Sequence, residues 1–153
     1  SAERRYGVLV RGRPAEELLR LPVRLHGIQL GRPTDLIVDL EAERAFGLDV
    51  LCGDEVHRFL PLAAATVNED EISVTSALTL LEEAELAFYR SHATALSELR
   101  GVEIVQDGAP VGRLRDVVVA GVGTLAAVLV EEDGELRLIE PDDGHRLHAG
   151  SPS

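Results

Sequence analysis

The chain contains the same nine-residue pattern twice, and this duplication constrains its fold more than any other feature. The pattern is an apolar residue, Gly, Arg, two variable positions and Asp, followed by three aliphatic residues. It occupies residues 30–38 and recurs at residues 111–119. Self-similarity of this kind indicates two copies of one structural unit, because each copy places its apolar residues at the same points of the same local structure.

A second similarity lies downstream of each copy of the pattern. Residues 55–61 match residues 135–141, and both segments end in proline. The spacing between the copies is 81 residues for Asp35 and Asp116 but 80 for the two prolines, so one single-residue gap aligns them. We therefore expect the two halves of the chain to superpose over these segments.

Each copy is predicted to contain an aliphatic strand and a hairpin. Residues 36–40 and 117–120 are short aliphatic runs rich in β-branched side chains, which favour strands. In the second copy, residues 125–130 and 135–139 flank an Asp-Gly pair. Such a pair closes a hairpin because both of its residues accept positive φ angles.

The first copy carries the corresponding turn signal at residues 52–54. Two further strands are expected from apolar patterns, near Tyr6 to Val10 and at Ile72 to Val74. No bulky apolar segment after Pro141 matches Ile72 to Val74. The second unit is therefore expected to borrow a strand, to stay partly open or to be incomplete.

The motif residues themselves are interpreted as structural. Gly31 and Gly112 precede the aliphatic strands, where the missing Cβ permits a bulge or a sharp bend. Asp35 and Asp116 are expected to accept backbone hydrogen bonds at a turn or bulge. A duplicated enzyme that uses the two carboxylates is the alternative. The full motif set is Gly31, Arg32, Asp35, Gly112, Arg113 and Asp116.

The hydrophobic period changes between the two copies. Residues 78–89 are predicted to form an amphipathic helix, with Ser76 capping its start, because apolar residues recur there at helical intervals. The stripe expected to dock on the sheet comprises Leu80, Leu81, Ala84, Ala87 and Phe88. The residues off this stripe, which are expected to bind a partner, are Leu78, Leu86 and Tyr89. A shorter helix is predicted from Pro14 to Arg20.

The duplicated Gly-Arg-x-x-Asp strand, followed by a hairpin that ends near a proline, resembles the PRC-barrel family. The resemblance covers residues 23–61 and 99–141. It implies a mainly β fold, with two small PRC-barrel-like β-barrels in tandem joined by the amphipathic helix. The expected divisions are a first module over residues 1–77, a connecting helix and linker over 78–97 and a second module over 98–153. The family implies an adaptor or docking role and brings no common catalytic residues.

The composition argues against several classes of partner. The net charge of −12 opposes direct binding to nucleic acid, and three Phe, two Tyr and no Trp leave few rings on which bases could stack. The single cysteine cannot form an internal disulfide and suits a reducing compartment, so a cytoplasmic location is expected. No apolar run reaches the ~20 residues that a membrane helix needs, so no membrane span is expected.

Neither a metal site nor a catalytic site is expected, and no cofactor is implied. The five histidines share no recognised ligand spacing with cysteine or carboxylates, and His145 and His148 alone lie close together in sequence. The acidic runs at residues 69–71 and 131–133 lack the alternating oxygen ligands of a calcium loop. Cys52 has no nearby partner motif and is interpreted as a structural thiol.

These observations favour a noncatalytic adaptor that binds a protein partner or forms a homodimer. Because the chain is strongly acidic, the partner is expected to present a basic surface. The expected contacts are the acidic runs at residues 69–71 and 131–133, the second being Glu131, Glu132 and Asp133, together with the exposed residues of the central helix. The alternative is a regulatory protein that binds a small molecule or an ion between the two modules.

Overall fold

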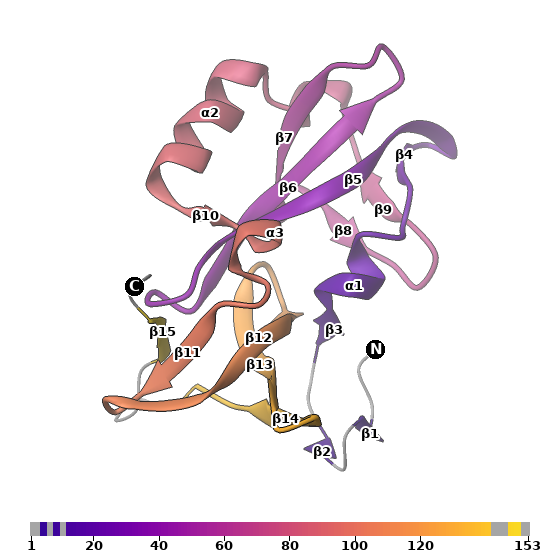
Figure 1. Ribbon diagram of the computed structural model, residues 1–153. Coiled ribbons are helices and arrows are strands. Elements are labelled where there is room, and N and C mark those ends of the chain that lie inside the picture. The colour runs from indigo at the N-terminus through magenta and orange to yellow at the C-terminus, as the bar shows by residue number, and fades with distance from the viewer. Residues whose placement is uncertain (1–3, 6–7, 10–11, 142–146, 151–153) are drawn as a thin grey trace.

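The computed structural model describes residues 4–5, 8–9, 12–141 and 147–150. The fold is mainly β, with few short helices (Figure 1). Thirteen strands join in one mixed sheet, and a two-stranded sheet lies near the N-terminus. This agrees with the mainly β fold expected from the sequence.

The elements follow the repeat along the chain. The first part contains β1 (Arg4–Arg5), β2 (Val8–Leu9), β3 (Arg13–Pro14), α1 (Ala15–Leu18), β4 (Val23–Leu25), β5 (Ile28–Asp39), β6 (Arg44–Cys52), β7 (His57–Pro61), the 3₁₀ turn η1 (Leu62–Ala64), β8 (Thr66–Val67), β9 (Ile72–Val74) and the 3₁₀ turn η2 (Ala77–Thr79). The second part contains α2 (Glu83–His92), β10 (Thr94–Ala95), α3 (Leu96–Leu99), β11 (Glu103–Gln106), β12 (Ala109–Ala120), β13 (Thr124–Glu132), β14 (Glu135–Ile139) and β15 (Leu147–Ala149).

The strand order departs from the expected pair of barrels. The hydrogen-bonded path runs β15-β11-β12-β13-β6-β5-β4-β9-β8, with β3, β7, β10 and β14 attached at its sides. The path has two ends, and the described residues form no closed barrel. Both copies therefore contribute to a single open sheet.

The strand ladders of the two copies repeat residue by residue. β5 pairs with β6, and β12 pairs with β13, in the same antiparallel register, so that Asp35 faces Asp49 where Asp116 faces Leu129. Both ladders shift register at the same two points, the first of them directly before the motif aspartate. The shared bulges show that the two sequences fold in the same local way.

The hairpins that follow differ in length. Leu48 pairs with Leu60 in the first copy, and Val128 pairs with Ile139 in the second. The spacing between the copies therefore falls from 80 to 79 residues within the hairpin. The expected match of the two downstream prolines was wrong by one residue, because the second hairpin has a shorter turn.

The motif glycines serve different purposes. Gly112 has a φ of 136°, which disfavours any residue with a Cβ. Gly31 is outside the positive-φ region, but a Cβ there would collide with the backbone oxygen of Leu51 on the paired strand. The first motif glycine is thus required by a close backbone approach and the second by its backbone angle.

In each copy, the two-residue strand and the short helix that begin the structural repeat pack on the other copy. β3 of the first copy pairs with β12 of the second, and β10 of the second copy pairs with β5 of the first. The helices that follow, α1 and α3, contact the same long strands. This exchange defines two lobes. The first lobe holds β4 to β7 with β10 and α3, and the second lobe holds β11 to β14 with β3 and α1.

The exchange produces one hydrophobic core for both copies. Its fully buried residues include Leu36 and Leu48 from the first copy and Val117 and Val128 from the second. The structural repeat of the second copy already begins at Thr94, within the segment expected to be a linker. Buried residues of both copies therefore pack in the same hydrophobic cluster.

Reciprocal hydrogen bonds join the two lobes where β6 meets β13. The Ala45 N–H donates to the Gly123 carbonyl (2.7 Å), and the Leu125 N–H donates to the Glu43 carbonyl (2.9 Å). Each pair is the counterpart of the other in the repeat, so the junction has approximate twofold symmetry. It makes the sheet continuous across the lobes.

The strand that the second copy was expected to lack is supplied by β15. β9 pairs in parallel with β4, and β15 pairs antiparallel with the equivalent strand β11. Leu147 of β15 is buried, as Ile72 of β9 is. β15, a short segment with one large apolar residue, thus pairs with the edge of β11. It runs antiparallel to that strand, whereas β9 runs parallel to β4. His148 lies in β15, whereas His145 lies outside the described residues, as do Tyr6 and Val10.

The α2 helix presents a different face from the one expected. α2 lies against β7 (Figure 1), with Leu86 buried and Tyr89 stacked on Phe59 at a ring-centroid distance of 4.2 Å. Phe88 is exposed. The predicted docking stripe was wrong for Ala84, Ala87 and Phe88, which are exposed on a helix that begins only at Glu83. Leu80 and Leu81 do pack against the hydrophobic clusters, but from the segment before the helix, between η2 and α2.

The predicted cap and partner residues change accordingly. Ser76 caps η2 through a hydrogen bond from the Leu78 N–H. Leu86 is in the core and is not available as a partner contact. Tyr89 is half-buried beside it, and Leu78 is exposed on η2.

Candidate functional site

The motif aspartate of the first copy holds the helix that starts the second copy. Asp35 Oδ1 accepts hydrogen bonds from the N–H groups of Leu36 (2.9 Å) and Ser97 (3.1 Å). Asp35 Oδ2 accepts a hydrogen bond from Ser97 Oγ (2.5 Å). Since Ser97 lies in α3, the carboxylate satisfies a backbone donor in the first turn of that helix.

A second carboxylate and two basic side chains complete this cluster. Asp49, opposite Asp35 in the ladder, contacts His57 Nδ1 and Arg90 Nη2, each at 2.7 Å. Arg90 Nη2 also lies 3.9 Å from Asp35 Oδ2. Two adjacent buried carboxylates require compensating charge. The last turn of α2 supplies it.

The equivalent cluster in the second copy is incomplete. Asp116 Oδ2 accepts a hydrogen bond from the Glu16 N–H of α1 (3.1 Å), which repeats the link between Asp35 and α3. The counterpart of Asp49 is Leu129, and the counterpart of His57 is Leu136. The nearest cation is Arg100, whose Nη2 lies 3.8 Å from Asp116 Oδ1.

Among the described residues, Asp116 Oδ1 is the one buried side-chain oxygen or nitrogen atom that has no hydrogen-bond partner. Burial raises the pKa of the Asp116 carboxyl above its ordinary value, although hydrogen bonds and Arg100 act in the opposite direction. A buried acceptor without a donor is unfavourable in a folded protein. In the described part of the chain, Asp116 is therefore the buried polar side chain whose hydrogen bonding is incomplete.

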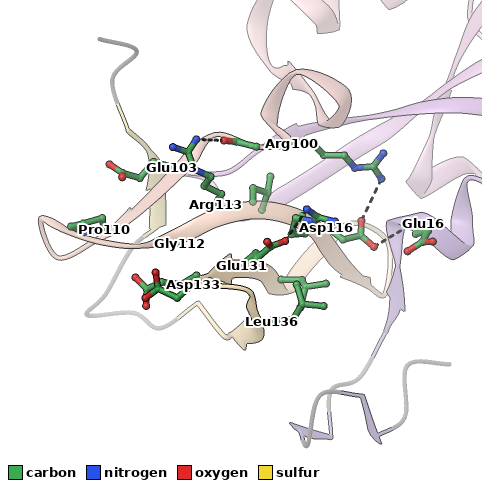
Figure 2. A pocket seen from close by; sticks show the side chains of 15 residues that line it. Glu16, Arg100, Glu103, Pro110, Gly112, Arg113, Asp116, Glu131, Asp133 and Leu136 are labelled. Carbon is green, nitrogen blue, oxygen red and sulfur yellow. Dashed lines mark hydrogen bonds and ion pairs between the residues drawn. The ribbon is translucent and has the colours of Figure 1, made fainter.

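Around Asp116 lies an open groove of about 950 Å³, the Asp116 groove (Figure 2). Its charged lining comprises Glu16, Glu103, Asp116, Glu131, Glu132 and Asp133, with Arg100, Arg113 and Arg115. Figure 2 shows the Asp116 carboxylate between Glu16 of α1 and the guanidinium of Arg100. The acidic side chains outnumber the arginines, so the groove favours cations.

Ion pairs within the groove neutralise only part of its negative charge. Arg115 Nη1 pairs with Glu131 Oε1 at 2.8 Å, and Arg113 Nη1 donates to the Gly101 carbonyl (3.0 Å). Leu129 and Leu136 form an apolar part of the lining. The groove lining thus combines an apolar part, Leu129 and Leu136, which we call its floor, with acidic side chains, which we call its rim.

The structure brings together some predicted site residues and separates others. Glu131, Glu132 and Asp133 line the same groove as Gly112, Arg113 and Asp116. Glu71 of the other acidic run pairs with Arg24 at 3.3 Å, away from the groove. The residues of the groove that the sequence interpretation missed include Glu16, Arg100, Leu129 and Leu136.

Other kinds of site find little support in the described residues. They contain no group of three or more His, Cys, Asp or Glu side chains that could hold a metal ion. None of their helices is both long and apolar enough to cross a membrane. The Cys52 thiol is buried, with its Sγ near the Val50 carbonyl (3.8 Å).

Comparison of the chain with models of known protein families and with curated proteins returns no match. The resemblance to the PRC-barrel family therefore rests on the repeated sequence motif alone.

Proposed function

We propose that this chain is a noncatalytic adaptor of the PRC-barrel kind, and that its second lobe binds a protein partner in the Asp116 groove. The difference between the two lobes carries the proposal. In the first lobe, α2 covers the paired aspartates and Arg90 neutralises them. In the second lobe, the equivalent surface is an open groove with a buried, incompletely paired carboxylate.

Charge supports a basic protein surface as the partner. The chain has a net charge of −12, and the groove itself is lined by more acidic than basic side chains. Complementary charge speeds association and helps to select the partner. The apolar floor adds the dry contact that a stable protein complex needs at its centre.

A small basic molecule is the second candidate ligand, and it makes the chain a regulatory protein rather than an adaptor. One observation favours it: Glu16 from the first copy lines the groove together with residues of the second copy. Ligand sites often lie at such junctions. A ligand of this kind would stabilise the purified chain against heat, because it binds only the folded state.

The proposal is tested by site-specific photo-cross-linking in the source cells. A benzophenone amino acid is placed at Leu136 in the groove, and in a control chain at His57, its half-exposed counterpart in the first lobe. We expect one recurring protein to be cross-linked from position 136 and not from position 57. Equal labelling from both positions, or none from position 136, contradicts an adaptor that uses this groove.

The cross-linked protein is then purified and its affinity for the chain is measured. Leu136→Arg places a positive charge on the groove floor and should weaken binding by about tenfold or more. A tenfold change in affinity corresponds to about 1.4 kcal/mol of binding free energy. An unchanged affinity would place the partner elsewhere on the chain.

A further inference from the structure

We infer that the Asp116 groove recognises an arginine side chain of the protein partner, with the guanidinium on the Asp116 carboxylate and the aliphatic stem over Leu129 and Leu136. The inference rests on the proposed function and names the residue that the partner contributes. The first lobe supplies the template. There Arg90 of α2 reaches Asp49 Oδ2 at 2.7 Å and lies 3.9 Å from the motif aspartate Asp35.

The second lobe keeps the motif aspartate but has Leu129 in place of Asp49, and one oxygen of the motif aspartate has no donor among the described residues. The Asp116 side chain is 8% exposed and belongs to the groove lining, and its buried Oδ1 has no hydrogen bond from any described residue. Arg100 Nη2, at 3.8 Å, is too distant for a hydrogen bond. An incoming N–H donor would satisfy this oxygen, and a charge-assisted bond to it is among the stronger polar contacts.

The groove walls select arginine over other groups. The apolar floor of Leu129 and Leu136 suits the methylene stem of a long basic side chain. A planar guanidinium presents several donors in a fixed fork, whereas an ammonium is a strongly hydrated point charge. An anionic group is disfavoured by the acidic excess of the lining.

Arg100 is the internal competitor for Asp116. Its side chain is 42% exposed, and Figure 2 shows its guanidinium directed at the Asp116 carboxylate. A partner arginine must displace it to reach Oδ1. Arg100→Gln removes this competitor together with its positive charge, so the variant should bind an arginine ligand more tightly.

The test uses the full chain and a designed probe, a fluorescein-labelled peptide of four residues in which leucine and arginine alternate. Fluorescence anisotropy gives its dissociation constant. The same peptide with citrulline in place of arginine keeps the shape and loses the charge, and a lysine version keeps the charge and loses the fork. We expect citrulline to weaken binding by about tenfold or more and lysine by several-fold.

Variants of the chain then assign the contact. Asp116→Asn should weaken the affinity of the chain for the arginine peptide by about tenfold. Asp70→Asn makes the same charge change in the other acidic run and should leave the affinity within about twofold, because an exposed distant charge is screened. Arg100→Gln should tighten binding. The methyl NMR signals of Leu129 and Leu136 should shift on titration with the arginine peptide.

Three results overturn the inference. The arginine and citrulline peptides bind equally, Asp70→Asn weakens binding as much as Asp116→Asn, or Arg100→Gln weakens it. The citrulline comparison uses the unaltered chain, so it decides the question even if Asp116→Asn fails to fold. The proposed function is judged separately. If a partner is cross-linked from position 136 but Asp116→Asn leaves its affinity unchanged, the adaptor proposal is retained and the arginine contact is rejected. If no partner is cross-linked, the adaptor proposal itself is rejected.

Discussion

The Asp35 carboxylate accepts hydrogen bonds from both the backbone N–H and the hydroxyl of Ser97, which lies 62 residues later in the chain. The motif aspartate of the first copy thereby holds the first helix of the second. The reverse link joins Asp116 to α1 through one hydrogen bond, from the Glu16 backbone N–H to Asp116 Oδ2. The repeated aspartate therefore fastens the exchanged segments, more tightly in the first lobe than in the second.

This difference predicts unequal costs for removing the two carboxylates. Asp35→Ala leaves the Leu36 and Ser97 N–H groups without their acceptor and should lower the free energy of unfolding by about 2–4 kcal/mol. Asp116→Ala removes fewer bonds and should cost about 1 kcal/mol. Urea unfolding of both variants measures the two values. A larger cost for Asp116→Ala would contradict the assignment of Asp35 as the stronger link.

The titration of Asp116 should be visible in the stability of the chain. Burial raises the pKa of its carboxyl in the folded state. Its contribution to stability is therefore complete below the ordinary aspartate pKa and is lost as the pH rises through the raised folded pKa. Asp116→Asn does not titrate, so its stability relative to the unaltered chain should increase as the pH rises from about 3 to about 7. Urea unfolding at several pH values measures the difference, and a difference that stays constant with pH contradicts the shift.

The local structure of the repeat could be predicted because its signals are local. The aliphatic runs at residues 117–120 and 125–130 and the Asp-Gly turn determine strands and a hairpin through nearby residues, and Asp133 and Gly134 have the expected positive φ angles of 53° and 81°. The exchange between copies had no such signal. β3 and β10 are two-residue strands, and their partners lie far away in the sequence.

The groove could be predicted in part. Its acidic rim at Glu131 to Asp133 was evident from charge, but its floor depends on which strand faces which. Alignment of the two copies does contain one usable signal, since a buried charged residue, Asp49, corresponds to an apolar one, Leu129. The role of Arg90 was not visible, because α2 brings it to Asp49 from 41 residues away.

The junction between the lobes should be sensitive to one added methyl group. Gly123 has a φ of 131°, and a Cβ there would collide with the Ala45 carbonyl oxygen. Gly123→Ala should lower the free energy of unfolding by about 2 kcal/mol or more, through backbone strain and separation of β6 from β13. Gly53→Ala is the control, because its added Cβ meets no atom within 4 Å. Equal melting temperatures for the two variants would contradict the close approach at Gly123.

The first-lobe cluster should tolerate loss of its cation only if the facing carboxylate is also removed. Arg90→Ala leaves Asp49 with His57 alone and should cost about 1–3 kcal/mol, reduced by solvent because Arg90 is partly exposed. Asp49→Leu copies Leu129 of the second lobe. The double variant should therefore be more stable than the sum of the single effects predicts, as a double-mutant cycle measures. Strict additivity would contradict direct coupling between Arg90 and Asp49.

Leu86 forms the buried face of α2, whereas Leu78, which the sequence predicted to lie on the same surface, is on η2 before the helix. Leu86 packs with Ile37, Phe59 and Ala95, whereas Leu78 is 87% exposed. Leu86→Glu buries a carboxylate in that cluster and should lower the free energy of unfolding by about 3 kcal/mol or more, at every protein concentration. Leu78→Glu should change it by less than about 0.5 kcal/mol. Thermal unfolding and sedimentation at two concentrations separate this outcome from a homodimer contact. If Leu86 were a dimer contact, Leu86→Glu would lower the sedimentation coefficient of a folded chain and leave the stability of the monomer unchanged.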